Sequence, residues 1–110
     1  MPFYLWQGSY TTTAIKAMVD NPHDRMPAAK ALVASAGGTL HHLFFCMGSD
    51  DIVAIAEAPD DAAMAAASLA LGASGAFSAG RTTKLMTSTE AMAAMQAAQS
   101  VLKGYKPATG

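Results

Sequence analysis

Two hydrophobic runs separated by a polar turn mark the middle of the chain as a β-hairpin. One apolar run spans residues 43–47 and another spans residues 52–56, with Gly48-Ser49-Asp50-Asp51 between them. Short apolar runs rich in β-branched and aromatic residues, joined through a Gly-containing turn, are typical of paired strands. We expect this turn to need a positive φ at Gly48 or its neighbour. Asp60 follows the second run and is placed to cap a helix.

The chain on either side of this hairpin repeats the plan of strand, helix and strand. The predicted segments are a strand over 3–9, a short helix over 14–19, a helix from Asn21-Pro22 to Gly37-Gly38, the hairpin strands from Thr39 to Ala56, a helix after Asp60, a Gly-rich loop over 72–80 and a strand over 81–87. Two such units predict an α+β fold. Its expected form is a ferredoxin-like βαββαβ plait, an antiparallel sheet with helices on one face.

A further helix is predicted after the last strand. Thr87 and Glu90 have the spacing of a capping box, and Met92, Met95 and Leu102 follow at helical spacing. This apolar stripe predicts that the appended C-terminal helix packs against the rest of the protein. We expect residues 1–103 to form one domain and residues 104–110 to be a flexible tail.

The predicted strands are apolar on both faces. The runs over residues 43–47 and 52–56, and Phe3 to Trp6 in the first strand, show no alternation of apolar with polar positions. Helices in a fold this short cover only one face of the sheet. The apolar residues on the other face therefore predict that it is covered, either through self-association as a homodimer or higher homo-oligomer, or by a large bound ligand. Strong strand formers on a partly solvated sheet are the simpler alternative.

Composition excludes several classes of protein. The chain has 110 residues, 52% of them hydrophobic, with seven Lys and Arg and a net charge of −1, which argues against disorder and against nucleic-acid binding. No apolar run approaches the roughly 18 residues of a membrane span, and no secretory leader is expected. The single Cys46 cannot form an internal disulfide. A cytoplasmic protein without nucleic-acid or membrane partners is therefore expected.

Several short motifs lie in one register along the chain. They are the Met1-Pro2-x-Tyr4 opening, Tyr10-Thr11, Pro22 with Arg25, Gly37-Gly38, the Gly48–Asp50 turn, the string from Ile52 to Asp61, Leu69-Ala70-Leu71 and Arg81-Thr82-Thr83. In these motifs the chain resembles the GYD-domain proteins, a bacterial and archaeal family. Ser49 stands where the naming Tyr of that family would be. The resemblance implies a plait similar to the dimeric α+β barrels, whose subunits press sheet to sheet, and it implies no established activity.

His42 is the candidate for chemistry. It is expected to share an apolar face with Phe44 and Cys46, where an imidazole can exchange protons near neutral pH. A histidine hydrogen-bonded at the sheet edge is the simpler interpretation. His41 and His42 are adjacent and are expected on opposite faces, and His42 and Cys46 lie roughly 13 Å apart along a strand. We therefore expect no metal site.

Two main hypotheses for function follow. We favour a homo-oligomeric small-molecule-binding module that needs no cofactor and holds an apolar or aromatic ligand. The expected ligand-binding residues are Tyr4, Trp6, Tyr10, His42 and Arg81. The alternative is an enzyme of the dimeric-barrel type, an isomerase or cofactor-poor oxygenase with His42 as catalytic base, or a haem-binding variant. An assembly protein with no ligand is a third possibility.

Overall fold

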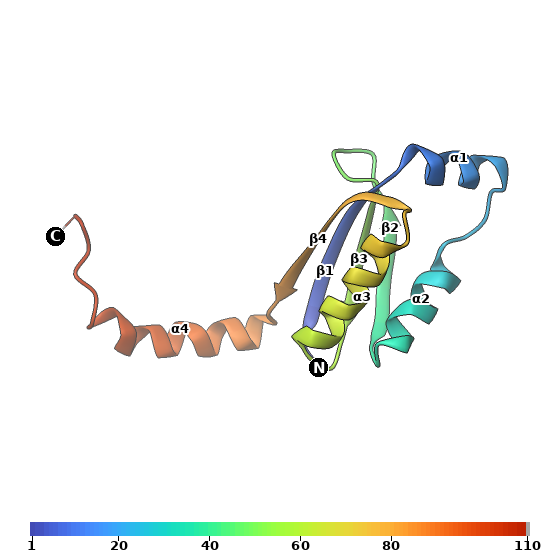
Figure 1. The fold of residues 1–110 in the computed structure, drawn as a ribbon. Coiled ribbons are helices and arrows are strands. Elements are labelled where there is room, and N and C mark those ends of the chain that lie inside the picture. Colours follow the sequence, from blue (N-terminus) through green and yellow to red (C-terminus); the bar gives the residue numbers. More distant parts are fainter. Residues whose placement is uncertain (110) are drawn as a thin grey trace.

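The fold is built on a four-stranded antiparallel sheet (Figure 1). It is seen in a computed structural model that describes residues 1–109. The elements in chain order are β1 (Phe3–Tyr10), α1 (Thr12–Asp20), α2 (Met26–Ser35), β2 (Thr39–Phe45), β3 (Ile52–Glu57), α3 (Asp61–Ala73), β4 (Phe77–Leu85) and α4 (Ser88–Leu102). The strand order is β2-β3-β1-β4, with β1 antiparallel to both β3 and β4. This arrangement confirms the predicted ferredoxin-like plait.

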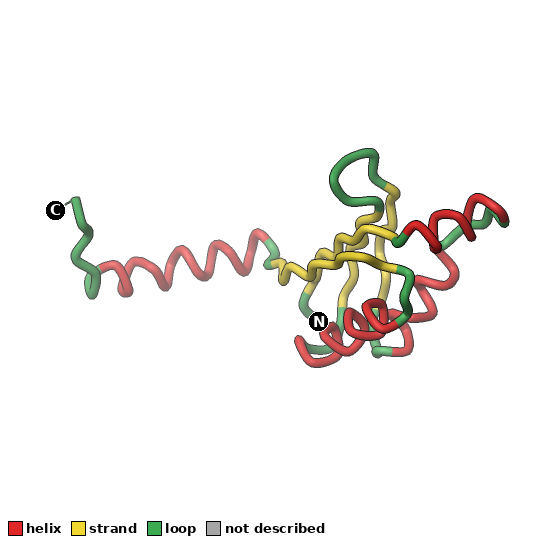
Figure 2. The backbone as a smooth tube through the Cα atoms, turned by 45° about the horizontal axis from the view of Figure 1, so that its top comes forward, coloured by secondary structure: helices red, strands yellow, loops and turns green. Residues whose placement is uncertain are grey.

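Figure 2 shows α2 and α3 on one side of the sheet, and the core lies on that side. Tyr4 and Trp6 of β1, Ile52 of β3 and Met64 of α3 are buried together. Because side chains alternate along a strand, the neighbours Leu5 and Ile55, which pair across β1 and β3, point to the opposite side. We call that side the open face, since neither α2 nor α3 covers it (Figure 2).

The first half of the chain differs from the prediction at the start of α2. This helix begins at Met26 rather than at Asn21, and Pro27 occupies its first turn. The Asp24 carboxylate accepts a hydrogen bond from the Met26 amide at 2.8 Å, so it satisfies one of the free donors of the first turn. Gly37, at φ +82°, ends the helix as predicted, in a conformation that glycine adopts without strain.

Two predictions about turns are wrong. No residue between Cys46 and Asp51 has a positive φ, and a Cβ atom added at Gly48 would meet nothing within 4 Å. The long connection between β2 and β3 therefore has no tight turn that requires glycine. The predicted loop over residues 72–80 is also too long, because α3 continues to Ala73 and β4 already begins at Phe77.

The predicted packing of the C-terminal helix is contradicted by the structure. α4 has the expected capping box between Thr87 and Glu90, but it projects from the end of β4 away from the sheet (Figures 1 and 2). Its apolar residues are exposed, with Met95 69% accessible. The molecule is consequently elongated, measuring 60 × 32 × 21 Å.

The predicted tail follows α4 and ends at Gly110, which lies outside the described residues. Within residues 1–109 no helix combines the length and the hydropathy that crossing a membrane requires.

Candidate functional site

A pocket of about 250 Å³ opens between α2 and α3, above the central strands of the sheet. It exists because α2 packs over β2 and α3 packs over β4, which leaves the middle of the sheet uncovered. Half of the helix residues that line it are alanines, Ala28, Ala29, Ala67 and Ala70, whose side chains are too small to fill this space. We call it the inter-helix pocket. Its lining residues are Trp6, Tyr10, Arg25, Ala28, Ala29, Leu32, Val33, Leu40, Leu43, Ile52, Ala54, Ala56, Met64, Ala67, Ala70, Leu71, Ser74 and Phe77.

Three aromatic rings form one end of the inter-helix pocket. Trp6 contacts Phe77 edge to face, with ring centroids 4.8 Å apart, and Tyr10 stacks on Phe77 at 4.6 Å. A hydrogen bond from the Tyr10 amide to the Asp51 carboxylate, at 2.8 Å, holds this end of β1 against the β2–β3 connection. The aromatic cluster therefore presents a rigid apolar surface to anything that enters the pocket.

Arg25 is the one charged residue that lines the pocket in the part of the chain described. It precedes α2 and is half-buried. Burial raises the pKa of the Tyr10 hydroxyl, and the nearby Arg25 guanidinium opposes part of this rise. The pocket thus combines apolar walls with a cation and a phenol.

A second hollow, of about 420 Å³, lies between α3 and β4. It shares Trp6 and Phe77 with the inter-helix pocket, but much of its remaining lining consists of glycine, alanine and serine residues. These small residues offer little side-chain surface for contact with a ligand. The inter-helix pocket is therefore the stronger candidate site.

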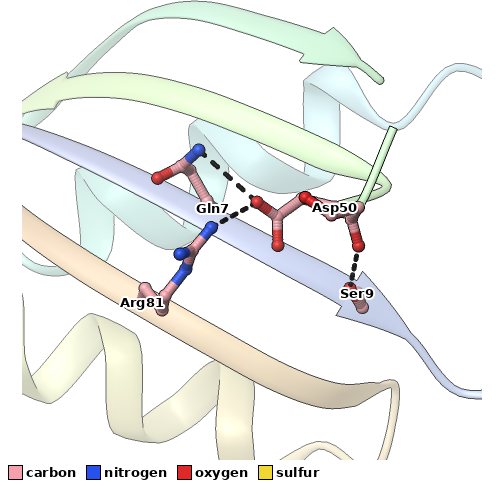
Figure 3. Close-up of polar contacts among 5 residues, drawn as sticks. Gln7, Ser9, Asp50 and Arg81 are labelled. Carbon is pink, nitrogen blue, oxygen red and sulfur yellow. Dashed lines mark hydrogen bonds and ion pairs between the residues drawn. The ribbon is translucent and has the colours of Figure 1, made fainter. Parts of the chain in front are cut away.

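The open face carries a polar cluster near one end (Figure 3). Asp50, from the β2–β3 connection, accepts a hydrogen bond from Gln7 of β1 at 3.5 Å and forms an ion pair with Arg81 of β4. Ser9 donates to the backbone oxygen of Ser49 at 3.4 Å. The charge of Arg81 is therefore balanced by Asp50, and the cluster fixes the connection to the sheet.

The two adjacent histidines of β2 lie on the same face, contrary to the prediction. A bulge interrupts the pairing between Leu40 and His42, so that His42 pairs with Ile55 while His41 reaches Glu57 at 2.7 Å. Ile55 and Glu57 are two residues apart on β3 and both point to the open face, so both histidines lie on that face. His42 stacks on Phe44 at 5.9 Å. Residues 1–109 contain no group of three His, Cys, Asp or Glu side chains placed to hold a metal ion.

The structure divides the predicted ligand-binding residues between two faces. Tyr4, Trp6 and Tyr10 lie on the helix side, whereas the open face carries His42 and Arg81. Trp6 and Tyr10 line the inter-helix pocket, but the Tyr4 hydroxyl is turned to Asp61, to which it donates at 2.6 Å. The expected set therefore does not line one pocket within a single chain.

Sequence reasoning missed Arg25 and Phe77 as pocket residues. Phe77 falls in the predicted loop over residues 72–80, and Arg25 falls near the start of the predicted helix, which in fact begins at Met26. The signal available for Phe77 was its position two residues after Gly75, which lies within the α3–β4 connection and has a positive φ of 78°. Nothing in the sequence indicated that Arg25 borders a cavity.

Comparisons with known proteins agree with this architecture. The crystal structure of MtbAldR superposes with a TM-score of 0.56 at 14% sequence identity, over 78% of this chain and 52% of that chain. The chain thus spans about half the length of the MtbAldR chain, and the likeness shows the fold alone. The sequence has no significant match among curated proteins. The GYD domain profile matches residues 4–95. Because this match covers most of the chain, the protein belongs to the GYD-domain family.

Proposed function

We propose that this protein is a homo-oligomeric module that binds a small apolar or aromatic molecule in the inter-helix pocket. The observation that carries the proposal is the pocket itself, a cavity of about 250 Å³ with an aromatic end and almost entirely apolar walls. Concave, mostly apolar sites with few polar groups are the usual form of small-molecule sites. The modest volume favours a ligand about the size of one or two fused rings.

The open face supports the oligomeric part of the proposal. Leu5, Val53 and Ile55 are only half-buried there, and Phe44 is 59% exposed. A contiguous apolar surface of this kind on a sheet is typical of an interface with another chain. A second copy of this chain presents the same surface, so two chains that pack open face to open face would bury the apolar residues of each.

The enzyme alternative draws less support from the geometry. His42 on β2 and Arg81 on β4 are separated by β3 and β1, a distance of roughly 14 Å at the usual spacing of strands. The ion pair between Arg81 and Asp50 also reduces what this arginine can contribute to an enolate oxygen. His42 and Arg81 of one subunit are therefore too far apart to act on the same small substrate.

Calorimetric titration with 2-naphthamide, a neutral two-ring probe, tests the binding proposal. We expect saturable binding near one probe per chain, together with a change in Trp6 fluorescence, since Trp6 is the only tryptophan and lines the pocket. Ala29→Phe, which places a ring in the pocket, should abolish binding. Ala31→Phe is the matched control, because Ala31 lies on the same helix but is exposed and does not line the pocket.

Two outcomes would contradict this proposal. If a folded protein binds no neutral or charged two-ring probe, the pocket is not a binding site and an assembly protein becomes the better hypothesis. If Ala29→Phe and Ala31→Phe bind the amide equally well, the probe occupies another surface.

A further inference from the structure

Arg25 differs from the other arginine of the protein in having no acidic partner among residues 1–109. Arg81 pairs with Asp50, and on the same strand Lys84 pairs with Asp61 at 3.0 Å. None of the ion pairs formed within residues 1–109 includes Arg25. Its positive charge therefore remains uncompensated at the wall of an apolar pocket, where the dielectric constant is lower than in water and an anion is attracted more strongly.

A histidine positions this charge without neutralising it. His23 Nδ1 lies 2.7 Å from the backbone oxygen of Asn21, and His23 Nε2 lies 3.0 Å from an Arg25 terminal nitrogen. A backbone oxygen only accepts and a guanidinium only donates, so both bonds form together when His23 is neutral with its proton on Nδ1. Arg25 is thus held by a neutral acceptor, which leaves other guanidinium N–H groups free to bind a ligand.

Among the described residues, those that line the pocket include no acidic side chain, although Asp51 contacts Tyr10 at the aromatic end. Asp51 accepts from the Tyr10 amide at 2.8 Å and is not among the lining residues. An anion next to Arg25 therefore meets one cation and the Tyr10 phenol, while its apolar portion meets Trp6 and Phe77. This distribution suits a molecule with one charged end and one apolar end.

We propose that the ligand of the inter-helix pocket is an apolar ring compound carrying a single carboxylate, which Arg25 binds as a fork while the ring rests on the aromatic cluster. This inference rests on the proposed function and names the class of ligand. One cation matches one negative charge, so polyphosphates and nucleotides fit poorly. A planar carboxylate matches the fork geometry of a guanidinium in a way that a single ammonium group does not.

The test compares 2-naphthoate with 2-naphthamide, two probes of nearly equal shape that differ in charge, by calorimetric titration at neutral pH. We expect the wild-type protein to bind the carboxylate at least about tenfold more tightly than the amide, the difference typical of a charge-assisted hydrogen bond. Arg25→Met should remove this preference, so that the variant binds the carboxylate and the amide with about equal affinity. Arg25→Lys should keep part of the preference, because it retains the charge but not the fork.

Lys30→Met is the matched control for loss of one positive charge. Lys30 lies on α2 but is exposed and does not line the pocket, so its removal should leave the preference unchanged. Equal affinity of the wild-type protein for both probes would overturn the inference and leave the proposed function intact. Binding of neither probe would overturn the proposed function itself. An equal loss of preference in Lys30→Met and Arg25→Met would show that general surface charge, rather than Arg25, attracts the carboxylate.

Discussion

The position of the Trp6 side chain depends on two glycines that pair with each other across neighbouring strands. Gly8 of β1 lies opposite Gly80 of β4, and the indole of Trp6 lies over both. A Cβ atom at Gly80 would stand 2.9 Å from the ring, and one at Gly8 would be closer still. Phe77 contacts Trp6 edge to face and limits the room the ring has to move. The glycine pair therefore sets the position of the ring that borders the pocket.

We predict that Gly8→Ala destabilises the protein by about 1–3 kcal/mol, the usual cost of overpacking a core. Denaturant unfolding followed by Trp6 fluorescence measures the loss. Gly48→Ala is the control and should be nearly neutral, because a Cβ atom there meets nothing within 4 Å. Equal stability of the two variants would show that Trp6 moves aside without cost.

A second residue-scale feature is the hydrogen bond between Tyr4 and Asp61. It raises the pKa of Tyr4 to about 12, and the bonds from Tyr4 and then Lys84 lower the pKa of Asp61 below its ordinary value. The contribution of Asp61 to stability is therefore present above its unfolded pKa and is lost as the pH falls through the lower folded value. The contribution of Tyr4 is present below its unfolded pKa and is lost as the pH rises toward its folded value.

We predict that Tyr4→Phe raises the pKa of Asp61 toward its ordinary value. The carboxyl carbon shift of Asp61, followed by NMR through an acid titration, measures the change. Lys84→Met should raise the same pKa by less, because the Tyr4 bond is the larger cause. A larger change in Lys84→Met than in Tyr4→Phe would contradict this ordering.

At the scale of elements, two helices have similar caps but different surroundings. The Asp60 side chain accepts from the Ala63 amide at 2.8 Å at the start of α3, and the Thr87 side chain accepts from the Glu90 amide at 3.1 Å at the start of α4. α3 packs on the sheet with Met64 buried, whereas α4 projects away from it. The same local interaction therefore supports the core in one case and a free helix in the other.

We predict that Asp60→Ala lowers the stability of the sheet domain by about 1 kcal/mol, the typical value of a lost N-cap. Thr87→Ala should reduce the helical circular dichroism without moving the unfolding midpoint reported by Trp6, measured in dilute protein where chains are separate. A lower Trp6 midpoint in Thr87→Ala would show that α4 packs against its own domain in solution.

At the scale of the whole molecule, the two sides of the sheet differ in how they are covered. The helix side has a core and a pocket, while the open face and the stripe on α4 leave apolar residues exposed, among them Phe44, Met92 and Met95. Exposed apolar surface on this scale is costly in water and favours association with another chain.

We predict that the wild-type protein is a dimer or a higher oligomer at micromolar concentration by light scattering, and that Ile55→Asp and Val53→Asp dissociate it. Both residues belong to the open face and are half-buried, so a charge there opposes contact between sheets. Leu69→Asp on the helix side is the control, because Leu69 is an exposed residue of similar size. Folded Ile55→Asp and Val53→Asp variants that stay assembled would place the interface elsewhere.

The order and type of the elements could be predicted from local pattern. The short apolar runs, the caps at Asp60 and Thr87, and Gly37 at the end of α2 act over a few residues, so the sequence alone indicates them. The family resemblance also followed from motifs in register, which the GYD domain match over residues 4–95 confirms.

What tertiary structure decided was which side chains meet. One extra residue at the bulge in β2 brings His41 and His42 to the same face, and a register shift of this kind leaves no mark on periodicity. Strand order and the positions of α2 and α3 on the sheet determine that Arg81 lies apart from Trp6 and that a pocket opens beside Arg25. A local pattern specifies elements because its interactions are short in sequence, whereas a pocket arises from contacts between segments that are far apart along the chain.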